Sequence, residues 1–302
     1  MFSNFSKELD KLNLEYKKDA PMKEHTSFKI GGNADYFVSV KNTEELKTII
    51  SLCRDKNVPY MLIGNGSNLL VDDEGIRGVV IRLEGDFKEI RIDGDFIEAG
   101  AGASLTKLCL DAWKASLTGL EFGYGIPGSV GGAAYMNAGA YGGEMKDVLV
   151  SCTHLDSELN VASFTLDELD LNYRHSAYMK GEYIILSVKL KLSKGDSTAI
   201  KARMDELMGK RMDKQPLEYP SAGSVFKRPE GAFAAALIEE CGLKGRSVGG
   251  AQVSEKHSGF IVNKGEATCK DVLDLVEIIQ DEVKEKTGYE LHREIIYIEG
   301  GK

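Results

Sequence analysis

Hydrophobic positions recur at helical spacing in several segments, most clearly near the C-terminal end of the chain. Thr268 and Asp271 have the spacing of a capping box, and Gly288 is suited to end the helix that they begin. One apolar stripe lies between these signals: Val272, Leu275, Val276, Ile279 and Val283. Similar patterns predict a helix over 3–17, with Leu9, Leu12 and Tyr16 on one side. Another is expected from a Thr43 cap to Asn57, with the stripe Leu46, Ile49, Ile50 and Cys53. Further helices are expected from a Ser104 cap through Ala115, over 197–213 and over 231–240.

Short runs of strand-like composition separate these helices. They do not alternate with helices as regular βαβ units do, so residues 20–192 predict an α+β arrangement. Pro216 and Pro220 indicate a junction at 193–220. The expected strands are 35–40, 59–63, 79–83, 87–92, 95–99, 148–155, 160–164, 183–192, two near 248–253 and 258–263, and a last one over 292–300.

Glycine is unusually frequent relative to proline, with 33 Gly and 6 Pro. A flexible chain usually raises both, so the imbalance indicates ordered loops that need positive φ or a close backbone approach. Nine of the glycines fall in residues 119–143. This stretch contains the G-x-G-x-x-G string from Gly123 to Gly128, but no clean apolar strand precedes it and Pro127 lies inside the turn, so a Rossmann unit is disfavoured.

Two glycine-rich loops are candidates for binding an anion. A short helix beginning near Gly128 and Ser129 would present N–H groups suited to a pyrophosphate, with an ordinary structural loop as the alternative. The second loop, 64–68, follows an expected strand and offers Asn and Ser donors; a hairpin turn explains it equally well. The pair Gly31 and Gly32 is a weaker candidate for the same kind of anion-binding loop.

A third candidate is the serine-containing turn from Ser221 to Arg228. Residues 201–228 hold seven basic and four acidic side chains, a local excess of +3 in a chain of net charge −9. An anionic small molecule would be attracted to this segment, although a solvated helix face explains part of the excess.

Charge and cysteine usage narrow the class of protein. A net charge of −9 disfavours nucleic acid as a partner. Five widely spaced cysteines without a C-x-x-C motif argue against disulfides and zinc, and the five histidines lack ligand spacing, so we expect no metal. The charged N-terminal segment is unlike a signal peptide and no apolar run is long enough to span a bilayer, so we expect a soluble, cytoplasmic protein without membrane association.

Five motifs occur together in one order. They are IGNGSNLLV, GYGIPGSVGGAAYMNAGAYGGE, NYRHSAY, PSAGSVFKRP and HREIIYIEG. In this combination the chain resembles the UDP-N-acetylenolpyruvoylglucosamine reductases, flavoenzymes of peptidoglycan precursor synthesis, from about Thr26 to the last strand. It resembles their shorter form, which lacks an inserted tyrosine-bearing loop.

The resemblance implies an α+β fold with an FAD-binding part of the vanillyl-alcohol-oxidase type. That part has two subdomains, expected at 1–78 and 79–200, followed by a substrate-binding domain at 201–290; the strand within 291–302 is expected to pack with the first subdomain. The loop at 64–68 has no histidine, so the FAD is expected to be non-covalent. The residues implied to hold it are Gly64, Asn65, Gly66, Ser67, Asn68, Gly128, Ser129, Gly131, Gly132, Asn137 and Gly139.

The family reaction implies roles for three further residues. NADPH delivers hydride to flavin N5, and the flavin passes it to C3 of the enolpyruvyl ether of UDP-N-acetylglucosamine. Ser224 matches the residue that protonates C2, while Arg174 and Glu294 match the residues that act on the substrate carboxylate, where negative charge develops. Lys214, Lys227 and Arg228 are candidates for the UDP phosphates or NADPH, and Tyr173 for closing the site.

Two other functions are compatible with parts of this pattern. One is an FAD-dependent oxidase of an alcohol or hydroxy acid, which the basic segment near Ser224 disfavours. The other is a non-catalytic nucleotide-sugar-binding protein, which the presence of all three catalytic residue types disfavours. We expect a monomer whose partners are NADPH and UDP-N-acetylglucosamine enolpyruvate, with UDP-N-acetylmuramate as the product.

Overall fold

The computed structural model describes residues 5–301, which fall into two compact units. Unit 1 contains the chain up to Tyr16 together with Phe37–Asn65 and Val80–Lys210. Unit 2 contains Lys17–Tyr36, Gly66–Val79 and the chain from Arg211 onward. Each unit is therefore assembled from three separate stretches of sequence. The three-part division expected from the sequence stays a prediction.

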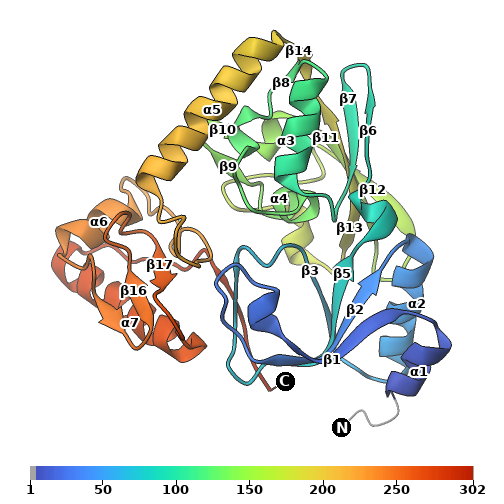
Figure 1. Cartoon of the computed structure of the whole chain (residues 1–302), viewed down its shortest axis with the longest axis horizontal. Helices are drawn as coiled ribbons and strands as arrows, with labels where there is room; N and C mark the ends of the chain where they lie inside the picture. The colour runs from blue at the N-terminus through green and yellow to red at the C-terminus, as the bar shows by residue number, and fades with distance from the viewer. Residues whose placement is uncertain (1–4, 302) are drawn as a thin grey trace. The chain divides into compact units, whose positions relative to one another are not determined.

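Unit 1 is built on a five-stranded antiparallel sheet with the strand order β12-β11-β13-β7-β6 (Figure 1). The short helix α4 (Val130–Tyr135) packs against β13 and β7, and α3 (Leu105–Lys114) packs against α4. This packing fixes the position of the glycine-rich segment around α4. The sheet strands are β6 (Ile90–Asp93), β7 (Phe96–Gly100), β11 (Leu149–Leu155), β12 (Val161–Thr165) and β13 (Ile184–Lys191).

A second sheet has the strand order β1-β2-β5-β3, and the boundary between the units falls within three of its strands. Helix α2 (Thr43–Asp55) follows β2 and buries the stripe expected from its sequence. The strands are β1 (Glu15–Pro21), β2 (Asn33–Val40), β3 (Tyr60–Ile63) and β5 (Ile76–Leu83).

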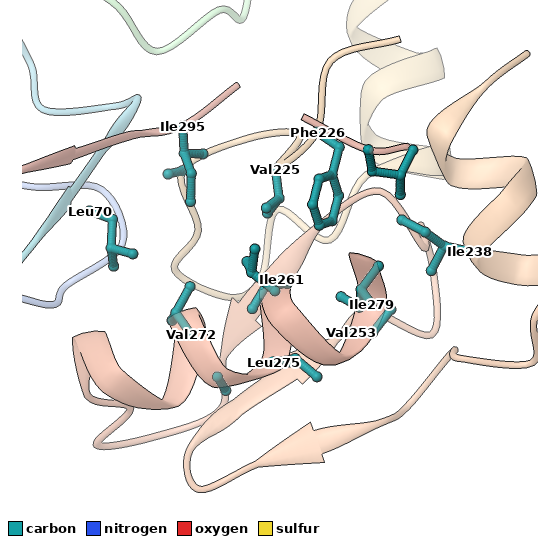
Figure 2. Close-up of a cluster of buried hydrophobic side chains, with 14 of the residues drawn as sticks. Leu70, Val225, Phe226, Ile238, Val253, Ile261, Val272, Leu275, Ile279 and Ile295 are labelled. Atoms are coloured by element: carbon teal, nitrogen blue, oxygen red, sulfur yellow. The ribbon is translucent and has the colours of Figure 1, made fainter. Parts of the chain in front are cut away.

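Unit 2 has a three-stranded antiparallel sheet, β15-β16-β17, against which α7 (Cys269–Thr287) packs. Figure 2 shows apolar side chains of α7 gathered with Val225 and Phe226 in one buried cluster. Each large apolar side chain buried in this way contributes about 1.5–3 kcal/mol to stability. The other elements are α6 (Ala234–Glu240), β15 (Ser247–Val248), β16 (Ala251–Val253), β17 (Ile261–Asn263), and β18 (Ile296–Ile298), which pairs parallel with β4 (Leu69–Val71).

The remaining elements are short connections and one long helix. They are α1 (Phe5–Lys11), α5 (Ser197–Lys214), the pairs β8 (Leu117–Thr118) with β14 (Ser193–Lys194) and β9 (Gly139–Ala140) with β10 (Gly143–Glu144), and the 3-10 helices η1 (Met22–Glu24), η2 (Gly85–Lys88), η3 (Glu121–Gly123), η4 (Met145–Asp147) and η5 (Ala177–Lys180).

The strongest local signals in the sequence are confirmed. Thr268 and Asp271 form the capping box of α7, its predicted stripe is buried, and Gly288 ends the helix at φ 77°. Ser104 caps α3 by accepting a hydrogen bond from the Lys107 N–H. These are signals in which the interacting atoms are only a few residues apart.

Several element boundaries differ from the expectation. Helix α1 ends at Lys11, and Tyr16 lies in strand β1; residues 3 and 4 of the expected helix lie outside the described part. Helix α2 is capped by Asn42 rather than by Thr43, because the Asn42 side chain accepts from the Glu45 N–H at 2.9 Å. Residues 87 and 88 belong to the 3-10 helix η2 rather than to a strand.

The expected strand at 292–300 is limited to β18, since only its last part pairs with β4. Strand β4 itself was not predicted. It is three residues long, and its partner lies more than 200 positions away in the sequence. Within residues 5–301, no helix is both long and apolar enough to cross a membrane.

Candidate functional site

In unit 1, the loop after β3 lies against the loop before α4. The Asn65 Nδ2 donates a hydrogen bond to the carbonyl of Pro127 at 3.2 Å. A Cβ atom at Gly64 would lie 2.3 Å from the Ser129 Oγ and 3.2 Å from the Ser129 Cβ, so the two loops are closely packed here. The structure therefore brings together the two segments that the sequence analysis had singled out separately as FAD loops.

The expected short helix after this loop is confirmed as α4. Ser129 is its N-cap and accepts from the Gly132 N–H at 3.2 Å. The Gly128 carbonyl accepts from the Leu105 N–H, and a Cβ atom at Gly131 would come within 2.8 Å of the Ala101 Cβ. The 3-10 helix η3, not a strand, precedes this turn, which agrees with rejecting a Rossmann unit.

In unit 2, the same loop continues through Gly66 to Asn68. Gly66 has φ +63°, and a Cβ atom there would lie 2.2 Å from the His25 carbonyl oxygen. Ser67 is half-buried. Strands β3 and β4, on either side of the loop, belong to different sheets, so the loop is not a hairpin turn.

Asn68 connects this loop to the segment that carries Glu294. Its Nδ2 donates to the Glu294 carbonyl at 3.3 Å, and its own carbonyl accepts from the Ile296 N–H at 2.9 Å. Glu294 is half-buried and lies two residues before β18. One predicted flavin-loop residue and one predicted catalytic residue are thus neighbours in unit 2.

Ser224 lies in an extended segment between two others. Gly223 before it has φ 78°, a left-handed conformation that suits glycine. On one side, the Val225 N–H donates to the Gly259 carbonyl at 2.9 Å; on the other, the Glu294 N–H donates to the Val225 carbonyl at 2.7 Å. The backbone therefore brings Ser224 and Glu294 onto adjoining segments, and both residues are half-buried.

Arg174 lies in unit 1, in a tight turn. Asn172 and His175 exchange backbone hydrogen bonds of 3.2 and 3.1 Å across the turn, and Arg174 has φ 51°. A left-handed backbone costs a non-glycine residue about 1–2 kcal/mol, and such strain is concentrated at functional sites. The guanidinium donates to the Gly139 carbonyl at 3.4 Å and lies 5.1 Å from the Tyr173 ring centre.

The remaining predicted substrate-binding side chains are exposed. Tyr173 is 50% exposed, and Lys214, Lys227 and Arg228 are all at the surface. The Arg228 guanidinium lies 4.5 Å from the centre of the Phe233 ring. Exposed cations of this kind contribute little to the fold.

The surroundings of the Arg174 turn were not expected from the sequence. Asn137 is fully buried, and its amide donates to the Asn172 carbonyl at 3.0 Å. The Ser176 hydroxyl donates to the Tyr135 carbonyl at 2.7 Å. An asparagine directly after a helix of small residues is a signal for a left-handed helix end, but neither hydrogen bond can be inferred from sequence spacing.

A carboxylate and a phenol interact beside β18. The Tyr297 hydroxyl donates a short hydrogen bond to the Asp72 carboxylate. This bond lowers the pKa of Asp72 and raises the pKa of Tyr297 to about 12. The pair links β18 to the chain just after β4, which supports the segment containing Glu294.

The residues present in the two loops fit a dinucleotide cofactor. Glycine at 64 and 66 allows backbone approaches that a Cβ atom would prevent, and Asn65 and Gly132 are exposed. Among residues 5–301, no group of three His, Cys, Asp or Glu side chains is placed to hold a metal ion. The two loops themselves offer backbone amides, hydroxyls and carboxamides, which are donors suited to phosphate oxygens.

Comparison with known proteins agrees with this arrangement. Residues 34–158 match the family model described as an FAD binding domain. Residues 215–298 match the model of the C-terminal domain of UDP-N-acetylenolpyruvoylglucosamine reductase. The expected FAD-binding part and C-terminal domain are confirmed by these matches, and the described helices and strands confirm the α+β class.

Similar proteins extend the match to nearly the whole chain. The UDP-N-acetylenolpyruvoylglucosamine reductase of Clostridium botulinum (strain Okra / Type B1) is 55% identical over 92% of this chain and 90% of its own. That of Clostridium novyi (strain NT) is 52% identical over 93% and 91%. The crystal structure of the Thermus caldophilus enzyme is 39% identical and has a TM-score of 0.81, covering 94% of this chain and 98% of its own. The chain belongs to the shorter form of the UDP-N-acetylenolpyruvoylglucosamine reductase family, which are FAD-containing oxidoreductases.

Proposed function

We propose that this chain reduces UDP-N-acetylglucosamine enolpyruvate to UDP-N-acetylmuramate with NADPH, in peptidoglycan precursor synthesis. Beyond family membership, one structural observation carries the proposal. The half-buried Ser224 and Glu294 lie on adjoining backbone segments, joined by the hydrogen bond from the Glu294 N–H to the Val225 carbonyl. A hydroxyl donor and a carboxyl group are thereby held in one small region of unit 2.

When bound, FAD would supply to C3 of the enolpyruvyl group the hydride that NADPH provides. The chain holds FAD non-covalently, since neither loop 64–68 nor loop 128–132 contains a histidine. These two loops contact the pyrophosphate of the cofactor. Asn137 and Gly139 follow in the same segment.

Ser224 donates a proton to C2 of the substrate. A serine hydroxyl is a weak acid, but a C2 carbanion is a far stronger base, so the transfer is downhill. Arg174 binds the substrate carboxylate with two parallel N–H donors and stabilises the enolate charge that develops there. Glu294 acts on the same carboxylate, either protonated or within a hydrogen-bond network, because a bare carboxylate would repel it.

The exposed basic residues supply the binding of the nucleotide-sugar. Lys214, Lys227 and Arg228 contact the phosphates of UDP or of NADPH, and Tyr173 closes over the substrate. The proposal includes a monomeric protein in the cytoplasm that acts without nucleic acid or membrane.

The experiment that tests this proposal is a two-step spectral titration of the purified, FAD-loaded protein. Anaerobic NADPH should bleach the flavin absorbance near its visible maximum, and UDP-N-acetylglucosamine enolpyruvate should then restore it with formation of UDP-N-acetylmuramate. Failure to reoxidise with this substrate would refute the proposal. Reoxidation by oxygen alone, with turnover of a small alcohol, would instead indicate an oxidase.

A further inference from the structure

We propose that Asn137 is a positioning residue that sets the turn carrying Arg174. The inference rests on the proposed function, because it takes Arg174 as the group that binds the substrate carboxylate. Asn137 was expected among the flavin-binding residues. Its surroundings assign its side chain a different task, whatever its backbone contributes to the cofactor.

The Asn137 carboxamide is occupied by contacts within unit 1. Its Nδ2 donates to the Glu144 Oε2 and to the Asn172 carbonyl, both at 3.0 Å, and its Oδ1 accepts from the Lys146 N–H at 3.0 Å. An asparagine amide has two N–H donors, and both are used here. The side chain is fully buried, so these bonds form away from water.

Two of these bonds link Asn137 to the turn that carries Arg174 and to a neighbouring hairpin. Asn172 begins the turn, and Glu144 pairs with Gly139 in the β9–β10 hairpin. The Gly139 carbonyl is in turn an acceptor for the Arg174 guanidinium. Asn137 thus bonds both to the start of the turn and to the hairpin that the arginine head group touches.

The other end of the turn is held independently. The fully buried Ser176 donates from its hydroxyl to the carbonyl of Tyr135, at the end of α4. The turn therefore rests on the C-terminal end of α4 through one side-chain bond at each end. Because Arg174 has a strained left-handed backbone, loss of one of these bonds lets the turn relax and moves the guanidinium.

The backbone of Asn137 explains its residue type only in part. Asn137 is the left-handed residue after α4, at φ 42°, in a Schellman motif: its N–H donates to the Ala134 carbonyl and the Ala138 N–H to the Ala133 carbonyl. Glycine satisfies this conformation at least as well as asparagine. Asn137→Gly therefore keeps the helix end and removes only the carboxamide.

The chain also contains a matched control. Asn57 is the left-handed residue after α2, at φ 51°, and its N–H and that of Val58 make the same two Schellman hydrogen bonds. Its side chain is exposed. Asn57→Gly is the same substitution at the same motif position, without a buried carboxamide to lose.

The test compares the two half-reactions by rapid mixing of FAD-loaded protein. Asn137→Gly should slow reoxidation by UDP-N-acetylglucosamine enolpyruvate at least tenfold, while reduction by NADPH and FAD affinity change less than twofold. Asn57→Gly should change neither half-reaction. Asn137→Asp, which keeps size and left-handed tolerance but places a carboxylate against Glu144, should slow reoxidation at least as much. Equal slowing of both half-reactions, or loss of FAD, would overturn the positioning role.

A double substitution separates this inference from the proposed function. In an Arg174→Ala background, Asn137→Gly should slow reoxidation less than twofold further, because its effect passes through the arginine. An undiminished effect in that background would overturn the inference alone. Normal reoxidation by Arg174→Ala itself would refute the role proposed for Arg174, and the positioning role with it.

Discussion

The segments that carry Ser224 and Arg174 are held in different ways. Around Ser224, backbone hydrogen bonds join three extended segments. The Arg174 turn is docked by side chains, since the Asn137 carboxamide and the Ser176 hydroxyl each donate to a carbonyl across the contact. A segment held by its backbone keeps its shape when a side chain is changed, whereas a side-chain-held turn transmits the change. A substitution at Ser224 should therefore affect only the chemical step. A substitution at Arg174 should affect both the chemical step and the position of the turn.

Ser224→Ala should have the largest effect. Removal of a general acid costs about 10²–10⁴-fold in the step that it catalyses, so reoxidation by the enolpyruvyl substrate should slow by that factor. Reduction by NADPH and the urea midpoint of unfolding should be unchanged, because the segment is held by its backbone. Ser221→Ala, in the same turn, is the control and should retain both rates. Wild-type rates in both half-reactions of Ser224→Ala would remove the proton-donor assignment.

Arg174→Lys should have the next largest effect. Lysine keeps the charge but lacks the planar pair of donors, and a hydrogen bond to a charged group contributes about 1.5–3 kcal/mol. We expect reoxidation at subsaturating substrate to fall by about 10- to 100-fold. A steady-state measurement with substrate varied at fixed NADPH would detect it. An unchanged rate would indicate that charge alone is required.

Arg174→Gly should separate stability from activity. Glycine adopts the observed φ of 51° without the cost of about 1 kcal/mol or more that a side chain incurs. The free energy of unfolding measured in urea should therefore rise by up to about 1 kcal/mol, while substrate-dependent reoxidation slows as in Arg174→Lys. A variant less stable than the wild type would show that the bond to Gly139 outweighs the backbone strain.

Tyr297→Phe should have the smallest effect, and one that depends on pH. The hydrogen bond from Tyr297 lowers the pKa of Asp72, so its contribution is present above the ordinary carboxyl pKa and is lost as pH falls through the lowered one. At neutral pH we expect a loss of about 1 kcal/mol in the free energy of unfolding. The difference from the wild type should narrow below about pH 4. A constant difference down to pH 2 would mean that packing, not the hydrogen bond, is responsible.

The sequence was sufficient to predict structure where the interacting residues are close together in the chain. The capping box of Thr268 and Asp271 acts over three residues, so its pattern alone predicts the start of α7. The start of α2 shows the limit of this reasoning. Asn42 and Thr43 are both good capping residues, and only the backbone conformation, extended at Asn42, decides between them.

Contacts between residues far apart in the chain could not be predicted from the sequence pattern. Strand β4 is too short to be recognised without β18, and the contact between Gly64 and Ser129 depends on loops 65 positions apart. The left-handed backbone of Arg174 has no local signal, since arginine does not favour it. The candidate catalytic residues were found only because five motifs matched one family in order.

The interrupted sequence of unit 2 has a consequence for biosynthesis. Phe28, Ile30 and Leu70 are buried in a cluster whose other buried members lie between residues 222 and 295. Ribosomes add about 5–20 residues per second, so Phe28 is made roughly 10–40 s before Val225. During this interval an early apolar segment has no native partner and is exposed to aggregation and to chaperones. Completion of unit 2 therefore waits for synthesis of its last stretch, and loss of residues 222–295 would leave its first stretches without a core.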